Sequence, residues 1–244
     1  MHTVIAFWNI LKKDIETYYL KPPNISWGIV FPLSWTLMQL IRSGGGTGIE
    51  ELLPGLMAMS VLFGTTSMLA VTITFERKGR SFDRLLIAPL SIGVLVFAKI
   101  LGAVLFGMFN AFVPVILAAF FINLSGVNWT AAVIGVVLIA VTSALLGLVI
   151  AVSAREVFEA QTFSNFFRFP MLFLCGLFIP IKQLPALLRP ISFCLPLTYG
   201  ADLLHGAVVG GSMFNVSFNV LVMLAFAALL FYLARRNISQ KWIL

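Results

Sequence analysis

Six stretches of the chain are almost wholly apolar, and shorter polar segments separate them. A helix needs about 20 mostly apolar residues to cross the hydrocarbon core of a bilayer. Lipid offers the backbone no hydrogen-bonding partner, so such segments cross membranes as helices. The pattern therefore predicts an all-α integral membrane bundle of six transmembrane helices. The predicted spans are Ile25 to Ile41, Leu52 to Phe75, Ile92 to Ile122, Thr130 to Ser153, Phe163 to Ile181 and Phe218 to Ala234.

The N-terminal segment, residues 1–21, carries apolar and charged positions at helical spacing. We expect it to form an amphipathic helix that lies in the membrane interface. Its basic residues follow the apolar positions, so we do not expect a cleavable signal peptide. The expected lipid-facing residues are Val4, Phe7, Trp8, Ile10, Leu11 and Ile15, and the expected water-facing residues are Lys12, Lys13, Asp14 and Glu16.

A proline-rich segment lies between the fifth and sixth predicted spans. Pro180, Pro185, Pro190 and Pro196 each remove an amide donor and interrupt a helix. Residues 182–211 are therefore too broken for a continuous crossing and too long for a simple turn. We expect short re-entrant helices that pack on the bundle, because irregular backbone at membrane depth must be covered by protein or water.

The composition supports a membrane protein with one domain, residues 1–244. Hydrophobic residues make up 60% of the chain, the mean hydropathy is +1.04, and Phe occurs 23 times. Soluble domains have about 45–50% apolar residues. The formal net charge of +7 is scattered between membrane-length segments instead of forming a compact basic face, so we do not expect nucleic acid as a partner.

The Lys and Arg residues fall mainly on one side of the predicted bundle. Cytoplasmic loops carry an excess of these residues, so the bias places both termini in the cytoplasm of a multi-pass plasma-membrane protein. The cytoplasmic group is Lys12, Lys13, Lys21, Arg77, Lys78, Arg80, Arg84, Arg155, Arg235 and Arg236, with Lys99, Arg168 and Lys241 nearby. The opposite side receives Arg42, Lys182 and Arg189.

A charged stretch follows the second predicted span, from Thr74 to Ser91. Ser81 is suited to cap a helix, Asp83 complements the helix dipole, and Pro89 ends the helical turn. The apolar positions Phe82, Leu85, Leu86 and Pro89 follow with a helical rhythm. Such a segment could be a solvated loop that only sets the topology, or a short amphipathic helix that docks into the groove of a partner.

The residues of this stretch resemble the membrane subunit of type-2 ABC transporters, the exporter permeases. The shared pattern lies at the end of the second of six spans. It consists of an acidic residue, a basic residue, any residue and Gly, which are residues 76–79 here, followed by Leu-Leu at 85–86 and Pro-Leu-Ser at 89–91. The resemblance implies that residues 76–91 are the coupling helix, which seats in a cleft of the ATP-hydrolysing subunit. Many relatives have a second acidic residue where this chain has Lys78. The implied docking residues are Glu76, Arg77, Lys78, Gly79, Phe82, Asp83, Arg84, Leu85, Leu86 and Pro89.

A second part of the resemblance lies near the end of the chain. Family members carry a proline after the fifth span, then Leu-Pro, then Pro-Leu-Thr-Tyr and an acidic residue. This sequence has Pro180, Leu184 with Pro185, Pro196 to Tyr199, and Asp202. The resemblance implies that residues 182–211 form the re-entrant helical pair on the extracytoplasmic side.

The chain has no G-x-x-x-x-G-K-S/T phosphate-binding loop. We therefore expect no catalytic residue and no cofactor bound by this chain, with ATP and Mg²⁺ on a separate ABC ATPase subunit. His2 and His205 have no second ligand at metal-binding spacing, so we expect no metal site. Cys175 and Cys194 are expected to be buried packing residues without a disulfide.

Membrane enzymes and proton-coupled carriers need ionisable groups within their spans. No Asp or Glu lies inside a predicted span, and Lys99 is expected to extend its side chain toward the cytoplasmic surface. The resemblance implies that the first, second and fifth spans line a translocation path between two permeases. The candidate path residues, each of which could instead be a packing residue, are Gln39, Thr65, Thr66, Asn165, Phe166, Phe173 and Phe178.

These observations lead to one functional hypothesis with two alternatives. The chain is predicted to be the permease of an ATP-driven exporter that works as a pair, with a homodimer expected. An aromatic and nearly uncharged path favours an amphipathic or apolar substrate, such as a lipid or a drug-like molecule. The alternatives are a permease that exports polysaccharide or glycolipid, and a membrane scaffold or sensor without transport.

Overall fold

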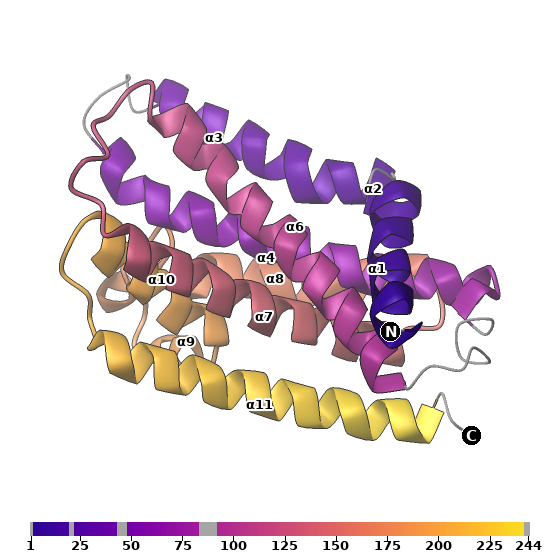
Figure 1. Cartoon of the computed structure of the whole chain (residues 1–244). Coiled ribbons are helices and arrows are strands. Elements are labelled where there is room, and N and C mark those ends of the chain that lie inside the picture. The colour runs from indigo at the N-terminus through magenta and orange to yellow at the C-terminus, as the bar shows by residue number, and fades with distance from the viewer. Residues whose placement is uncertain (1, 20–21, 43–47, 83–91, 242–244) are drawn as a thin grey trace.

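The computed structural model describes residues 2–19, 22–42, 48–82 and 92–241. The described residues form helices joined by turns and loops, with no strand among them, so the all-α prediction is confirmed. The helices, in chain order, are α1 (His2–Asp14), α2 (Pro22–Ile25), α3 (Phe31–Arg42), α4 (Ile49–Lys78), α6 (Ile92–Ala118), α7 (Trp129–Ser153), α8 (Val157–Leu174), α9 (Arg189–Phe193), α10 (Pro196–Val208) and α11 (Val216–Lys241). π-Helical stretches, Ile15–Tyr19 and Ser26–Val30, follow α1 and α2 (Figure 1).

Four helices in the described part of the chain are long and apolar enough to cross a membrane. They are Ile49–Lys78, Gly93–Ala118, Trp129–Ser153 and Val216–Ile238. The first predicted span corresponds to the helical stretch 22–42, and the fifth corresponds to α8, which has 18 residues. The count of six spans therefore stays a prediction.

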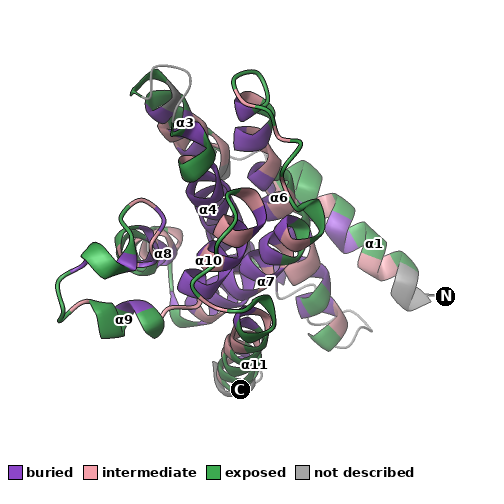
Figure 2. Ribbon diagram, turned by 90° about the vertical axis from the view of Figure 1, so that its left-hand side faces the viewer, coloured by how far each residue is buried: buried purple, intermediate pink, exposed green. Residues whose placement is uncertain are grey.

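Helix α4 is the centre of the bundle. It has 30 residues and is thus about 45 Å long. Its apolar window is buried along its whole length, and α3, α6, α7, α8 and α10 pack around it. Figure 2 shows this helix as the buried axis, with the exposed surfaces on the elements around it. A displacement of α4 would therefore disturb the packing of all five of these helices.

Small residues let the backbones of α4 and its neighbours approach closely. A Cβ atom added at Gly147 of α7 would lie 2.8 Å from the carbonyl oxygen of Thr66 in α4. A Cβ atom added at Gly64 of α4 would lie 2.5 Å from the amide nitrogen of Asn110 in α6. Small residues at such contacts are typical of helix association in membranes. These glycines therefore determine which faces of α4, α6 and α7 contact each other.

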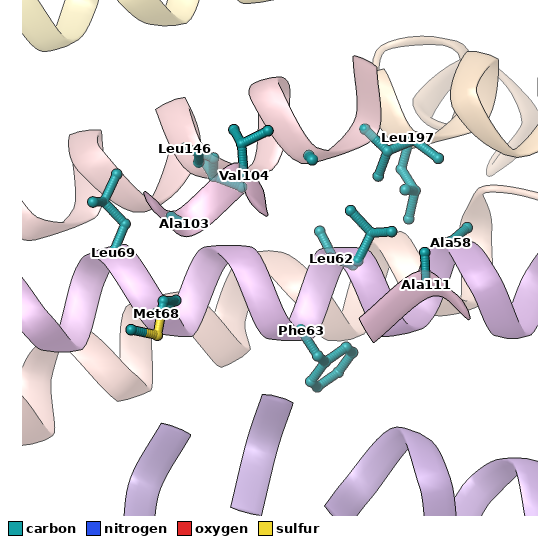
Figure 3. Packing of buried hydrophobic residues seen from close by; sticks show 14 of the residues in the cluster. Ala58, Leu62, Phe63, Met68, Leu69, Ala103, Val104, Ala111, Leu146 and Leu197 are labelled. Carbon is teal, nitrogen blue, oxygen red and sulfur yellow. The ribbon is translucent and has the colours of Figure 1, made fainter. Parts of the chain in front are cut away.

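Larger apolar side chains fill the space between these close contacts. Figure 3 shows Leu62, Phe63, Met68 and Leu69 of α4 among side chains from three other helices. The partners labelled there are Ala103, Val104 and Ala111 of α6, Leu146 of α7 and Leu197 of α10. The core thus joins the middle of the chain to α10, within the segment predicted to be re-entrant.

Helix α11 lies on the outside of the bundle, against α7 and α10. Its apolar window is only 17% buried. Apolar side chains cover its outer surface, including Leu221, Leu224, Leu229 and Phe231. A helix that is apolar on its exposed side is suited to contact lipid.

Three boundaries of the predicted third and fifth spans differ from the structure. The helix of the predicted fifth span begins at Val157 instead of Phe163, because Glu159 in its first turn accepts a hydrogen bond from the backbone N–H of Arg155 at 2.7 Å. This helix ends at Leu174, since Gly176 has a left-handed backbone (φ 77°). The helix of the third predicted span ends at Ala118 instead of Ile122.

The segment 182–211 is broken into short helices, as its prolines predict. A single 3₁₀ turn, Ile181–Gln183, precedes α9 and α10. Pro190 and Pro196 each lie in the first turn of their helix, where the missing amide hydrogen costs no hydrogen bond. The re-entrant path through the membrane stays a prediction.

The expected orientation of α1 is partly wrong. Trp8 is exposed, as predicted. Ile10 and Leu11 are instead buried, because α1 packs against α6. Asp14, which was predicted to face water, is only 2% exposed. One face of α1 therefore belongs to the core of the protein.

Both cysteines are free, but only Cys175 is buried. Cys194 is exposed, so the prediction that it is a packing residue is wrong. It immediately follows the five-residue helix α9, which packs less extensively than the long helices.

The two ends of the bundle carry different elements. Helix α1 and the C-terminal ends of α4 and α11 lie at one end (Figure 1). Helix α10 and the N-terminal ends of α4 and α7 lie at the other end. The first end is called the α1 end below, and the second is called the α10 end.

We predict that Gly147→Ala lowers the free energy of unfolding in detergent by about 1–3 kcal/mol, as overpacking does in other tight cores. The new methyl group would meet backbone of α4, which cannot move aside as a flexible side chain can. Gly93→Ala in α6 is the matched control, because its Cβ has no atom within 4 Å. Equal stability of the two variants would show that the α4–α7 contact is looser than described.

Candidate functional site: the charged end of α4

Helix α4 ends at the charged stretch that was predicted to dock a partner. The backbone N–H of Gly79 donates to the carbonyl oxygen of Phe75 at 3.0 Å and closes the last turn. Arg80 then adopts a left-handed conformation (φ 53°), which turns the chain away from the helix axis. Lys78, Gly79 and Arg80 are exposed, so this turn presents cations at the α1 end of the bundle.

Glu76 lies inside the protein instead of on the docking surface. Its carboxylate pairs with Lys99 of α6 at 2.6 Å and also with Lys13 of α1. Asp14 of α1 pairs with Lys99 at 3.0 Å and with Lys13 at 3.2 Å. We refer to Lys13, Asp14, Glu76 and Lys99 as the ion-pair cluster. It joins three helices that are far apart in the sequence.

The ion-pair cluster balances two ammonium groups against two carboxylates. The side chains of Glu76 and Lys99 are 0% and 1% exposed, and the side chain of Asp14 is 3% exposed. Removing a charge from water is costly, and only close pairing offsets that cost. The cluster is therefore stable only while α1, α4 and α6 stay together.

The ionisation of the N-terminal segment reflects this environment. Burial opposes the charged form of Lys13, but the carboxylates of Asp14 and Glu76 outweigh burial and raise the pKa of its ammonium group. Burial raises the pKa of the Tyr19 phenol as well, and the same two carboxylates add to that effect. Lys13 thus stays charged and Tyr19 stays neutral at physiological pH.

Further hydrogen bonds hold the end of α4 on its other sides. Arg77 donates from Nη1 to the carbonyl oxygens of Ala151 and Ala154 at 3.1 Å each, at the C-terminus of α7. The hydroxyl of Ser81 donates to the carbonyl oxygen of Glu76 at 3.1 Å. The start of the docking segment is therefore fixed to α7 as well as to α1 and α6.

The structure separates the predicted docking residues into three groups. Lys78 and Gly79 are exposed, and Arg77 is half-buried at the contact with α7. Phe82 is 2% exposed and belongs to the core, whereas the sequence predicted it as part of an apolar docking surface. Asp83, Arg84, Leu85, Leu86 and Pro89 lie outside the described residues.

The ion-pair cluster was not predicted from the sequence. Lys13 and Asp14 were placed toward water and Lys99 was expected to extend to the surface, whereas Lys99 is buried. One feature of the sequence could have indicated part of the cluster. Glu76 near the end of one span and Lys99 near the start of the next carry opposite charges. Consecutive helices run antiparallel, so these two positions fall at the same end of the bundle.

The predicted path residues are not gathered on one surface. Gln39, Thr65 and Thr66 are buried, and an added Cβ at Gly107 would meet the Thr65 hydroxyl at 1.9 Å. Phe166 and Phe173 on α8 are 70% and 51% exposed. Asn165 and Phe178 are half-buried. Of the predicted path residues, only those on α8 and Phe178, which follows α8, are exposed or half-buried.

Arg168 of α8 is the largest fully buried side chain in the described part of the protein. Its guanidinium donates to the hydroxyl of Ser67 at 2.6 Å and to the carbonyl oxygen of Phe63 at 3.3 Å, both in α4. It also donates to the side-chain oxygen of Asn165 at 2.8 Å and lies 4.6 Å from the Phe63 ring centroid. Arg168 thus fixes α8 to α4 halfway along the bundle.

We predict that Glu76→Gln destabilises the protein by about 3–5 kcal/mol, the usual cost of breaking a buried ion pair, because Lys13 and Lys99 would then share the single carboxylate of Asp14. The double variant Glu76→Gln with Lys99→Met restores the charge balance and should regain part of that loss. Unfolding by a denaturing detergent measures both. Glu50→Gln, at an exposed position in the first turn of α4, is the control. A loss no larger than that of the control would contradict the role of the cluster.

Comparison with known proteins finds a transport permease and nodulation proteins among the similar chains. The chain is 25% identical over 203 residues to the inner membrane transport permease YadH of Escherichia coli strain K12, covering 80% of this chain and 79% of that protein. It is 26% identical over 213 residues to nodulation protein J of Bradyrhizobium diazoefficiens, covering 83% and 78%. It is 24% identical over 212 residues to nodulation protein J of Rhizobium meliloti, covering 84% and 78%.

A family model describes most of the chain. The model for the ABC-2 type transporter matches residues 5–209, which include the ion-pair cluster, the docking segment and α10. The chain therefore belongs to the ABC-2 type transporter family.

Proposed function

We propose that this chain is the permease of an ATP-driven exporter and that it works in a pair with a second copy and two ATPase subunits. Membership of the family makes the chain a membrane component of a transporter and implies an ABC ATPase as its partner. ATP and Mg²⁺ would be bound by that partner. The permease would convert its motion into transport.

The observation that carries this proposal is the position of α4. One end of the helix carries the exposed cations at Lys78 and Arg80, directly before the predicted docking segment. The rest of the helix is enclosed by the bundle. A partner that moves residues 76–91 would therefore move the axis of the whole permease, and rigid-body motion of this kind is a common switching mechanism.

The docking surface would be built from the exposed turn and the residues that follow it. Lys78 and Gly79 lie at the surface, while Phe82 is buried and would anchor the segment to the bundle. Asp83, Arg84, Leu85, Leu86 and Pro89 would contact the ATPase. Glu76 would act indirectly, because its ion pairs fix the base of the segment against α1 and α6.

The path for the substrate would follow α8. This helix exposes a series of aromatic rings, namely Phe158, Phe163, Phe166, Phe167, Phe169 and Phe173. The ring of Phe178 continues the series and packs on Trp35, with 5.7 Å between the ring centroids. Thr65, Thr66 and Gln39 would reach the path only when α4 separates from its neighbours. An aromatic surface of this kind favours an amphipathic or apolar substrate.

We predict that Leu85→Ser with Leu86→Ser reduces co-purification with the ATPase subunit by about tenfold or more. Each buried Leu contributes about 1.5–3 kcal/mol, and tenfold in affinity corresponds to about 1.4 kcal/mol. The measurement is the amount of ATPase retained by tagged permease after co-expression with the ABC ATPase encoded nearest to it.

The control for this experiment is Leu187→Ser. Leu187 is 83% exposed and lies between the 3₁₀ turn Ile181–Gln183 and α9. This variant should retain the ATPase fully. If the double variant also retained it, residues 76–91 would not be the docking segment, and a scaffold or sensor without an ATPase would become the better interpretation.

We predict that Phe166→Ala with Phe173→Ala lowers ATP-dependent transport of an amphipathic dye into inverted proteoliposomes by about tenfold. The two rings would contribute apolar contact area to the substrate, with about 1.5–3 kcal/mol for each buried ring. ATP hydrolysis and assembly with the ATPase should be preserved, because neither residue belongs to the docking segment, and Arg168 between them on α8 contacts Phe63 and Ser67 in the middle of α4.

Phe109→Ala is the matched control, since Phe109 is 66% exposed on α6. Equal dye transport by the double variant and the control would exclude the α8 surface as the path. Transport of a glycolipid, with no transport of the dye by the unaltered protein, would favour the alternative of a permease for polysaccharide or glycolipid.

A further inference from the structure

A cavity of about 510 Å³ lies beside α10, at the α10 end of the bundle. One face of α10 forms its floor, with Thr198, Ala201, Asp202 and His205 at helical spacing. Residues 175–182 and 211–214 form the other walls. Cavities of about 300–1,000 Å³ are the usual size of small-molecule sites. Neither the predicted path nor the docking segment accounts for it.

A second cavity of about 150 Å³ continues the first toward the start of α4. The two share Gly176, Pro180, Ala201 and His205 as lining residues. The smaller cavity is also lined by Glu51 in the first turn of α4. The two cavities therefore adjoin each other at these four residues, and we refer to them together as the hollow.

Hydrogen bonds hold the walls of this hollow in place. Asp202 accepts from the backbone N–H groups of Met213 and Phe214 at 2.6 and 3.0 Å, and from Asn219 at 2.8 Å. Gly211, whose φ of 82° favours glycine, brings its carbonyl oxygen to 3.2 Å from Nδ1 of His205. These contacts tie the loop after α10 back onto the helix.

The opposite wall is fixed in a similar way. Arg189 donates to the carbonyl oxygen of Lys182 at 2.7 Å and to that of Leu184 at 2.9 Å. The segment before it packs so closely on α4 that a Cβ atom added at Gly55 would lie 2.5 Å from the carbonyl oxygen of Leu177. The hollow is thus a shaped site between fixed walls.

The hollow is lined by a cation and an anion that have no ion-pair partner among the described residues. Lys182 lines the larger cavity and Glu51 lines the smaller one, and neither forms an ion pair among the described residues. The carboxylate of Asp202 differs, because three hydrogen bonds already occupy it. A ligand that fills both cavities would therefore meet an ammonium group at one end and a free carboxylate at the other.

Among the remaining lining residues, Thr198 and Ser212 are polar and the others are mostly apolar. Ile181, Met213 and Phe214 lie beside Lys182 in the larger cavity, and Leu52 and Phe178 lie beside Glu51 in the smaller one. Apolar walls with a few convergent polar groups are typical of ligand sites. The arrangement suits a molecule with a charged head group and an apolar part.

We propose that this hollow binds an amphiphile with a zwitterionic head group, its anionic phosphate or carboxylate toward Lys182 and its ammonium toward Glu51. A purely anionic head group would be repelled by Glu51, and a purely cationic one by Lys182. His205 lines both cavities, and the ring nitrogen that does not face the Gly211 carbonyl oxygen can hydrogen-bond the head group. This site does not depend on ATP-driven transport.

The test is a binding titration of the full-length protein in a non-ionic detergent. The probe is dihexanoyl phosphatidylethanolamine, and binding is followed by calorimetry or by intrinsic tryptophan fluorescence, to which Trp35 contributes from its position against Phe178 at the wall of the hollow. We expect saturable binding that is about tenfold tighter than for dihexanoyl phosphatidylglycerol, which has the same chains and lacks the ammonium group.

Lys182→Met and Glu51→Gln should each weaken binding about tenfold, because each removes one charge-assisted contact. Lys12→Met and Glu50→Gln are the matched controls, as both residues are exposed and neither lines the hollow. All four positions are at the surface, so folding should be preserved.

Three results would overturn the proposal. One is the absence of saturable binding, and another is unchanged affinity in Lys182→Met and Glu51→Gln. The third is equal affinity for phosphatidylglycerol, or for glycerophosphoethanolamine, which has the head group without the chains. Loss of transport with intact binding would count against the exporter function and not against this site. Intact transport without binding would count against the site alone.

Discussion

Apolar side chains gain little by leaving lipid for protein, so helices in a bilayer associate through close packing and polar contacts. The structure satisfies this constraint around α4, where small residues bring the backbones of α6 and α7 close to it at Gly64 and Gly147. Arg168 adds a polar contact between α4 and α8. The rest of the architecture depends on these contacts, because α10 and α11 are placed by packing on helices that α4 already positions.

Charge has a different role at the α1 end. Three of the four ionised side chains in the ion-pair cluster are buried, and burying them separately would be unfavourable. They are acceptable only in one arrangement, in which α1 lies against α4 and α6 and each carboxylate meets two ammonium groups. Apolar packing alone would let α1 slide along the surface of the bundle. The cluster therefore specifies a position for a helix that the membrane interface would otherwise leave free.

The periodicity and length of apolar segments were sufficient to predict the helical class and the positions of the long helices, because both depend on local sequence. The contacts of a single side chain depend on which helices become neighbours. The pattern of apolar segments does not contain that information. Lys99 and Asp14 were therefore assigned to water although each is buried against the other. Phe82 was assigned to a docking surface for the same reason. The cavity beside α10 was not predicted, since its lining comes from three separate segments.

The two cysteines of the chain differ in a way that is useful for experiments. Cys175 is enclosed by the core, whereas Cys194 is open to the surroundings beside α9. Cys194 is therefore the accessible thiol of the two, and it lies between α9 and α10, at the α10 end of the bundle. A membrane-impermeant maleimide applied to intact cells would report on which side of the bilayer this end lies, with no engineered residue and with a Cys194→Ser variant as the blank.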